Sequence, residues 1–334
     1  MRSFLRTCIL LTTVAIALVC VPAQSTRAEA KAQATNSTIP IEPELEKLAG
    51  DAAHDAIAKF PKDMIQEKDL AVTIIDLHDP DHPRQGNFRG NEGFYPASVV
   101  KLFYLAATQR WLADGKLADT PELRRTMHDM IVDSSNDATG AIVDAVTDAP
   151  NGAVLPDAQM KQWAYKRNAM NRYFESLGYP VGAEHGINVC QHTYCDGPYG
   201  RERIFLGPHY ENRNQLTTNA TARLLSEIVR GKAVSAQRSK EMMELLHRDI
   251  AGKSAGPDDQ AHDFTARALE PGSGLWSKAG WTNTARHDAA YVETPDHAVK
   301  VVIVTFTVHH SNQKEIIPTI AKHVIEALRK SEEQ

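Results

Sequence analysis

Apolar positions along the chain repeat at helical spacing in some stretches and run together, as in buried strands, in others. Helical spacing predicts helices over residues 43–60, 98–113, 121–132, 136–147, 156–177, 217–229, 235–248 and 313–330. Apolar runs bounded by turn residues predict strands over 70–77, 84–94, 275–282, 288–293 and 299–308. Residues 178–214 and 251–263 carry neither pattern, so we expect irregular structure there.

The order of these elements predicts an α+β fold. The strands from the two ends of the chain would form one antiparallel five-stranded sheet, covered by the first and last helices. We therefore expect an α/β lobe made of residues 43–97 and 270–334, with an inserted all-helical lobe over 98–269. Together they would make one catalytic domain, 43–334, with Ser98 at the seam between the lobes, where clefts usually form.

The first thirty residues have the pattern of a cleaved secretory signal. Arg2 and Arg6 precede an apolar stretch from residue 8 to 19, and small residues flank Glu29 at the expected cleavage site near Ala30. This pattern predicts a periplasmic or secreted protein, with residues 31–42 as a flexible leader. Lipid attachment at Cys20 is an alternative.

Charge and cysteine usage narrow the class further. The formal net charge of -5 gives no reason to expect nucleic acid or an anionic membrane as partner. Outside the signal the chain has two cysteines, Cys190 and Cys195, and in an exported protein a local disulfide is the default expectation. A metal site using His185 and His192 is an alternative, but no second ligand pair is nearby, so we expect no metal and no cofactor.

The stretch around Ser98 carries candidate chemistry. In a helix Ser98 and Lys101 lie one turn apart among apolar neighbours. Burial disfavours the charged form of a lysine, so Lys101 could take the proton of Ser98 and activate it as a nucleophile. A solvated serine and lysine would show the same spacing by chance.

Two further motifs follow in order. Ser134-Ser135-Asn136 lies between two predicted helices, where it could equally serve as a helix cap. Lys278-Ala279-Gly280 lies on a predicted strand, where a lysine is ordinarily solvated and a glycine allows close approach of another backbone.

With these three motifs in this order and context, the chain resembles the penicillin-recognising serine enzymes, namely the class A β-lactamases and their D,D-peptidase relatives. The resemblance implies that Ser98 attacks an amide carbonyl, that Lys101 helps to remove its proton, and that Ser134 relays the proton to the leaving nitrogen. It also implies that the backbone N–H groups of Ser98 and Trp281 form the oxyanion hole. The implied substrate contacts are Asn136, Lys278, Gly280 and Trp281.

The sequence departs from the family pattern at several positions. Ser135 replaces an aspartate, and Ala279 replaces a threonine whose hydroxyl binds the substrate carboxylate. Arg286 is our candidate for that missing contact, with Thr282 and Ser277 as alternatives. The family also has a glutamate that positions the deacylating water, and Glu202 is our candidate for it. Glu184 and Glu211 are alternatives, and Leu206 stands where the family has an asparagine.

These observations predict an exported, monomeric serine hydrolase of the β-lactamase type that opens the β-lactam amide through a Ser98 acyl-enzyme. A D-alanyl-D-alanine carboxypeptidase, or another amide or ester hydrolase, is the close alternative. A penicillin-binding sensor without turnover is a third reading, favoured by Ala279 and by the uncertain glutamate. The expected partner is a small-molecule substrate.

Overall fold

A computed structural model describes residues 39–182, 185–194 and 197–332 of the chain. Its five strands are β1 (Leu70–Asp76), β2 (Arg84–Phe88), β3 (Gly274–Trp281), β4 (Ala285–Glu293) and β5 (Lys300–Val308). They form one antiparallel sheet in the order β2-β1-β5-β4-β3, which confirms the predicted fold class. The predicted signal, with Cys20, and most of the leader lie outside the described residues.

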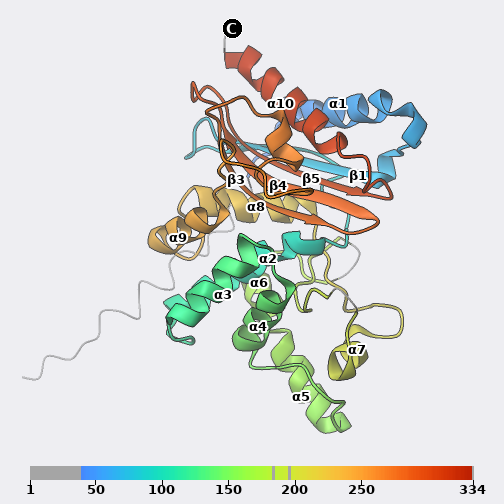
Figure 1. Cartoon of the computed structure of the whole chain (residues 1–334), viewed down its shortest axis with the longest axis vertical. Helices are drawn as coiled ribbons and strands as arrows, with labels where there is room; N and C mark the ends of the chain where they lie inside the picture. The colour runs from blue at the N-terminus through green and yellow to red at the C-terminus, as the bar shows by residue number, and fades with distance from the viewer. Residues whose placement is uncertain (1–38, 183–184, 195–196, 333–334) are drawn as a thin grey trace, which may run out of the picture. The chain divides into compact units, whose positions relative to one another are not determined.

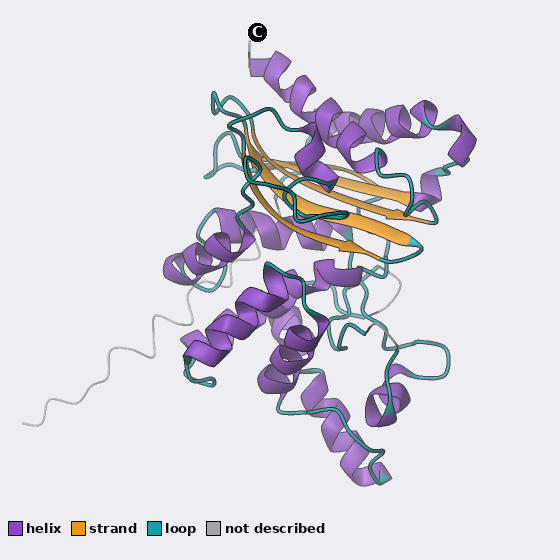
Figure 2. Ribbon diagram, in the orientation of Figure 1, coloured by secondary structure: helices purple, strands orange, loops and turns teal. Residues whose placement is uncertain are grey.

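Helices cover both faces of the sheet (Figures 1 and 2). On the outer face lie α1 (Pro43–Lys59) and α10 (Ile316–Glu332). On the inner face lies α8 (Thr218–Val229), which packs against β1, β4 and β5. Since both faces are covered, β1 and the interior of β5 are buried at every position, and the sequences of both strands are mostly apolar.

The remaining helices lie between β2 and β3 in the chain. They are α2 (Lys101–Ala113), α3 (Pro121–Ile131), α4 (Asn136–Thr147), α5 (Asp157–Arg167), α6 (Ala169–Ser176), α7 (Gly200–Leu206) and α9 (Ala236–Leu246). Short 3-10 turns occur at Pro61–Asp63, Glu67–Asp69, Ala97–Val100 (η4) and Phe264–Ala268 (η5). None of the described helices is both long and apolar enough to cross a membrane.

Local chemistry explains where the elements begin and end. Thr217 caps α8 by accepting the N–H of Ala220 at 3.1 Å, and the helix begins close to the predicted start at 217. The helix predicted over 156–177 is broken at Asn168, whose backbone leaves the helical region between α5 and α6. Strand β4 begins at Ala285 rather than at 288, because its pairing with β5 extends to Val308.

The predicted lobe boundaries group α8 with the inserted helices, whereas its packing attaches it to the sheet. Thr218 on α8 accepts a hydrogen bond from Thr73 on β1 at 2.8 Å. The buried side chains of α8 also belong to the large apolar cluster that joins the inner face of the sheet to α2 and α4. The inserted segment is therefore attached to the sheet through one of its own helices, α8.

One glycine fixes how closely α1 approaches the sheet. A Cβ built on Gly86 of β2 would lie 2.0 Å from the backbone carbon of Leu45 on α1, where no side chain fits. The apolar face of α1, including Ala49, Ala52 and Ala56, is buried against this region. The small side chains of the helix and the glycine of the strand together allow this approach.

We expect Gly86→Ala to lower the free energy of unfolding by about 2 kcal/mol or more, because the added methyl would force α1 away from β2. Gly50→Ala is the matched control. Gly50 lies within α1 with no atom within 4 Å of an added Cβ, so this change should stabilise the protein by about 0.5–1 kcal/mol. Urea unfolding of both variants measures the two effects, and equal effects would contradict the close approach.

Candidate active site

Ser98 lies at the junction between the sheet and the inserted helices. It belongs to the turn η4, which leads directly into α2, so it stands at the start of a helical segment as predicted. The residue before it, Ala97, has a φ of 47°, a left-handed conformation that is costly for a residue with a Cβ. A strained backbone conformation of this kind persists only where packing by the surrounding structure fixes it.

Strand β3 is the part of the structure that presses on this turn. A Cβ added to Gly280 would lie 2.6 Å from the backbone nitrogen of Ser98 and 2.8 Å from that of Val99. A side chain at position 280 is therefore excluded. The glycine of the Lys278-Ala279-Gly280 motif lets β3 lie directly against the backbone of the predicted nucleophile.

A buried histidine holds the chain just before Ser98. The Nε2 atom of His287 on β4 lies 2.9 Å from the carbonyl oxygen of Tyr95, and its Nδ1 accepts the N–H of Thr307 at 3.0 Å. Burial lowers the pKa of His287 to about 4, so the imidazole is neutral at pH 7. The histidine therefore acts as a fixed neutral link between the sheet and the turn that carries Ser98.

Lys101 brings the first two motifs together. Its side chain is fully buried, and its Nζ donates to the carbonyl oxygen of Ser134 at 2.6 Å. The same Nζ lies 3.1 Å from Ser134 Oγ and 2.9 Å from Asn136 Oδ1. Ser134 has a φ of 56°, which places its hydroxyl and its carbonyl on the same lysine. The structure thus gathers Lys101, Ser134 and Asn136, which the sequence placed in two separate motifs.

Lys278 approaches the same group from β3. It is fully buried, and its Nζ donates to Gln260 Oε1 at 2.6 Å and to the carbonyl oxygen of Ala279 at 2.8 Å. Burial lowers its pKa well below the usual value, and the charge of Lys101 lowers it further. Gln260 was not anticipated, because a lone glutamine in a polar connection carries no pattern that marks it as a partner.

Arg286 lies on the sheet face opposite to Lys278. Its guanidinium donates to Asp258 Oδ1 at 2.7 Å and lies 3.9 Å from the centre of the Phe264 ring. Phe264 is fully buried and packs on Ala279, while Trp281 is 39% exposed and packs on Phe264 from the other side. Arg286 is therefore already paired, and its assignment as a carboxylate contact stays a prediction.

The two alternatives to Arg286 are also occupied or buried. The Thr282 hydroxyl accepts the backbone N–H groups of Thr284 and Ala285 at the turn between β3 and β4. Ser277 is 1% exposed, so its side chain is closed off from solvent.

Glu202 on α7 is fully buried beside Arg167 of α5, which is also fully buried. The distance from Glu202 Oε2 to Arg167 Nη2 is 3.0 Å, and Glu202 Oε1 accepts the backbone N–H of His192 at 3.1 Å. This pair ties α7 to α5. The alternative Glu211 is exposed and accepts the N–H of His209, and Glu184 lies outside the described residues. The short helix α7 itself was not predicted.

Cys190 is a buried free thiol that lies 2.9 Å from Asn188 Oδ1, and burial raises its pKa. Its predicted partner Cys195 lies outside the described residues, so the disulfide is not shown. Both ring nitrogens of His192 have partners, Asp144 at 2.7 Å and Tyr194 at 3.0 Å, which leaves the imidazole no lone pair for a metal shared with His185.

Solvent-accessible hollows flank the segment 191–194 next to these residues. One, of about 530 Å³, is lined by Asn136, Asp144 and Tyr194, and another, of about 310 Å³, by Tyr95, Gln191 and Arg213. Thr193 joins this segment to the site, because its hydroxyl donates to Asn136 Oδ1 at 2.8 Å. The hollows therefore open beside the group that Lys101 gathers.

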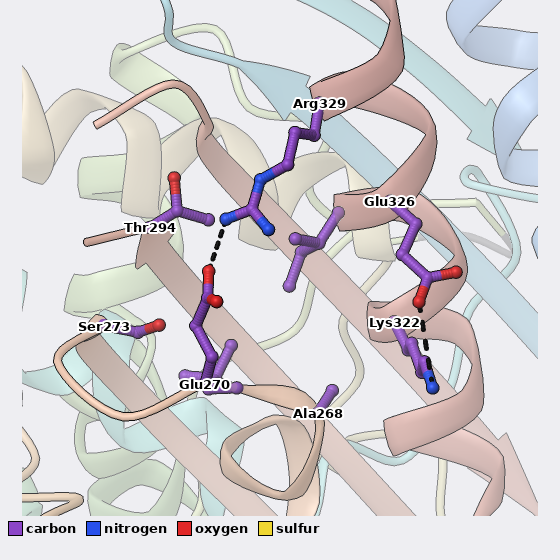
Figure 3. A pocket seen from close by; sticks show the side chains of 9 residues that line it. Ala268, Glu270, Ser273, Thr294, Lys322, Glu326 and Arg329 are labelled. Carbon is purple, nitrogen blue, oxygen red and sulfur yellow. Dashed lines mark hydrogen bonds and ion pairs between the residues drawn. The ribbon is translucent and has the colours of Figure 1, made fainter. Parts of the chain in front are cut away.

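A smaller hollow of about 160 Å³ lies on the outer face of the sheet, beside α10 (Figure 3). Its charged side chains pair with one another, Glu270 with Arg329 and Lys322 with Glu326. Ser273 also lines it, but no base lies within hydrogen-bond reach of that hydroxyl among the described residues. This hollow lacks the combination of nucleophile and buried lysine found around Ser98.

Comparisons with known proteins give a matching family and a set of similar folds. A family model described as the beta-lactamase enzyme family matches residues 118–328, a stretch that begins after Ser98 and Lys101 and includes the other two motifs. No curated protein matches the chain.

Solved structures of similar fold include a beta-lactamase from Sphaerobacter thermophilus, with 17% identity, a TM-score of 0.56, and coverage of 83% of this chain and 97% of that chain. PBP-A has 17% identity and a TM-score of 0.59, over 88% of this chain and 100% of that chain. A beta-lactamase from Chitinophaga pinensis has 17% identity and a TM-score of 0.54, over 83% and 99%. At this identity the likeness shows the fold.

We expect Arg167→Leu to lower the free energy of unfolding by about 3–5 kcal/mol, because it leaves the Glu202 carboxylate buried without its partner. Removing both charges in Arg167→Leu/Glu202→Leu should recover a large part of that loss. Lys166→Leu is the control, since among the described residues the exposed Lys166 pairs with exposed Asp148, and its loss should change stability by about 0.5 kcal/mol or less. Urea unfolding at pH 7 tests all three, and a small cost for Arg167→Leu would rule out a strong buried pair.

His287 should make stability depend on pH. Its pKa is 6.5 in the unfolded chain and about 4 in the folded protein, so the unfolded chain binds more protons as the pH falls from 6.5 to 4. We expect the wild type to lose about 3 kcal/mol over this window that His287→Gln does not lose. If the free energies of unfolding of the two proteins fall in parallel between pH 6.5 and 4, His287 has the same pKa in the folded and the unfolded states, against the prediction.

Proposed function

Because the chain belongs to the beta-lactamase enzyme family, we propose that it is a serine hydrolase in which Ser98 attacks a substrate carbonyl. The observation that carries this proposal is the convergence of Lys101 on Ser134 and Asn136, with β3 held against the backbone of Ser98. A buried lysine beside a serine at the start of a helical segment is the arrangement that an activated nucleophile needs.

In the proposed first step, Ser98 Oγ bonds to the carbonyl carbon of the amide and its proton passes to Lys101. The electron pair of the C=O bond moves to the oxygen, where the N–H groups of Ser98 and Trp281 would stabilise the negative charge. The C–N bond then breaks, and a proton delivered from Lys101 through Ser134 neutralises the leaving nitrogen. In a β-lactam this step opens the ring and leaves an ester on Ser98, which water hydrolyses in the second step.

The two buried lysines, Lys101 on α2 and Lys278 on β3, support the electrostatics of this mechanism. The pKa of Lys278 is lowered by burial and by Lys101, so the site favours holding fewer positive charges than its lysines could carry. Two neighbouring lysines that repel each other favour a neutral amine, which would serve as the base for acylation.

A second candidate function, penicillin binding without efficient turnover, is favoured by the buried pair of Glu202 and Arg167. Both oxygens of the fully buried Glu202 carboxylate are engaged, Oε2 by Arg167 and Oε1 by the backbone N–H of His192, which leaves the group poorly placed to orient a water molecule. A variant of PBP-A, one of the solved structures of similar fold, is described as an acyl-enzyme complex with penicillin G. A long-lived ester between Ser98 and a penicillin would support this second candidate function.

We also propose that the protein is exported, on the basis of the signal pattern in residues 1–30. Export would bring the site into contact with extracytoplasmic amides, including β-lactams.

Intact-mass measurement with a penicillin and a cephalosporin tests the proposal. We expect the protein to gain the mass of one drug molecule, and Ser98→Ala to gain none. Lys101→Ala should slow formation of this adduct by about 10²-fold or more, because the proton acceptor is lost.

The fate of the adduct separates the two candidates. Decay within minutes, with opened drug appearing, would identify a β-lactamase, whereas an adduct that persists for hours would identify a penicillin-binding protein. Absence of any adduct on the wild type, or the same adduct on Ser98→Ala, would refute Ser98 as the nucleophile for these compounds.

A further inference from the structure

The segment from Asp258 to Phe264, which we call the β3-covering segment, lies over the part of β3 and β4 that carries the site's cations. Lys278 on β3 and Arg286 on β4 are both almost completely buried. They lie on opposite faces of the sheet and so flank the border strand β3. An anionic group of a substrate lying along the edge of β3 would be attracted to both, since charge-assisted hydrogen bonds to ammonium and guanidinium groups are strong. In this structure both cations are already engaged by the covering segment.

Gln260 accepts the hydrogen bonds that the Lys278 side chain and the β3 backbone would otherwise offer to a substrate. Its Oε1 accepts two hydrogen bonds, from Lys278 Nζ at 2.6 Å and from the backbone N–H of Ala279 at 3.0 Å. An oxygen that receives an ammonium and a backbone N–H is placed as a bound carboxylate oxygen would be. The amide nitrogen of Gln260 donates to the carbonyl oxygen of Val132 at 3.0 Å, which fixes the side chain in place.

Asp258 and Phe264 close the remainder of this surface. Asp258 accepts from Arg286 at 2.7 Å and also pairs with Lys314 at 2.8 Å, so the charge of Arg286 is neutralised. The Phe264 ring packs on Ala279 and stacks under the guanidinium of Arg286. The methyl of Ala279 is fully buried in this cluster, together with Phe264 and Ile317.

We propose that the β3-covering segment sets substrate specificity by filling the place of a substrate carboxylate, so that the site prefers an acyl donor that is neutral beside its leaving group. This inference rests on the proposed function, because it concerns the substrate of the Ser98 site. It accounts for Ala279, since a hydroxyl at that position would face the Phe264 ring and find no ligand. The preferred class is an amide or ester whose leaving side carries no carboxylate.

Binding of a matched ligand pair tests the inference. The pair is benzylpenicillin and its methyl ester, which share the β-lactam and differ only in the charge of the carboxyl group. Binding is measured by calorimetry on the full-length Ser98→Ala protein, so that acylation does not interfere. We expect the acid to bind no more tightly than the ester.

Removing the occupying side chains should change that ratio. In Gln260→Ala and in Asp258→Ala, each made in the Ser98→Ala protein, we expect the affinity for the acid to rise about tenfold relative to the ester, because Lys278 or Arg286 is released. Gln237→Ala and Asp51→Ala are the matched controls, since both residues are exposed on the helices α9 and α1 and should leave the ratio unchanged.

A tenfold preference of the Ser98→Ala protein for the acid would overturn the inference, and this measurement needs no variant of the covering segment to fold. An unchanged acid-to-ester affinity ratio in both segment variants would also overturn it. The absence of measurable binding of either ligand to these variants would overturn it as well. The proposed function is judged separately, by whether the ester forms a Ser98 adduct on the wild-type protein. If the acid-to-ester affinity ratio changes as expected but the ester forms no Ser98 adduct, the serine-hydrolase proposal is refuted, and the β3-covering segment remains the determinant of binding.

Discussion

The contact between β3 and the turn that carries Ser98 is the constraint on which the rest of the site depends. Gly280 brings the strand against the backbone of Ser98, and the register of β3 with β4 sets Gly280 opposite His287. His287 in turn holds Tyr95, so the turn that carries Ser98 is held by two neighbouring strands. A shift of one residue in this pairing would put a side chain where the glycine is and would exchange the inner and outer faces of the strand.

Electrostatics follow from the same arrangement. Because β3 lies against the start of α2, two buried lysines share one small region, and the pKa of Lys278 falls. The polar groups that compensate them come from the chain itself: Ser134 and Asn136 for Lys101, and Gln260 for Lys278. The glutamate that could have supplied a negative charge is instead neutralised by Arg167 at a distance from this group. The site is therefore organised around amines.

The sequence predicted those parts of the structure that depend on local pattern. The five strands, the helix over 217–229 and the three motifs all follow from spacing and residue type, and the order of the elements predicts the sheet. Contacts between distant polar residues could not be predicted in this way. Gln260 and Arg167 lie in segments with no motif, and Arg286 was assigned from its place in the chain alone. Its outward direction is set by the pleat of β4, which places it beside Asp258.

The two borders of the sheet show a consequence of these contacts for association. Residues 40–42 pair with Gln85 along the β2 border. On the β3 border, Arg248 bonds the carbonyl oxygens of Leu275 and Ser277, and Gln260 bonds the N–H of Ala279. Uncovered borders invite strands of other molecules to add, which leads to aggregation. On the β3 border the contacts made by Arg248 and Gln260 end just before Trp281, so an extended peptide could pair with this border at its last residue, beside Ser98.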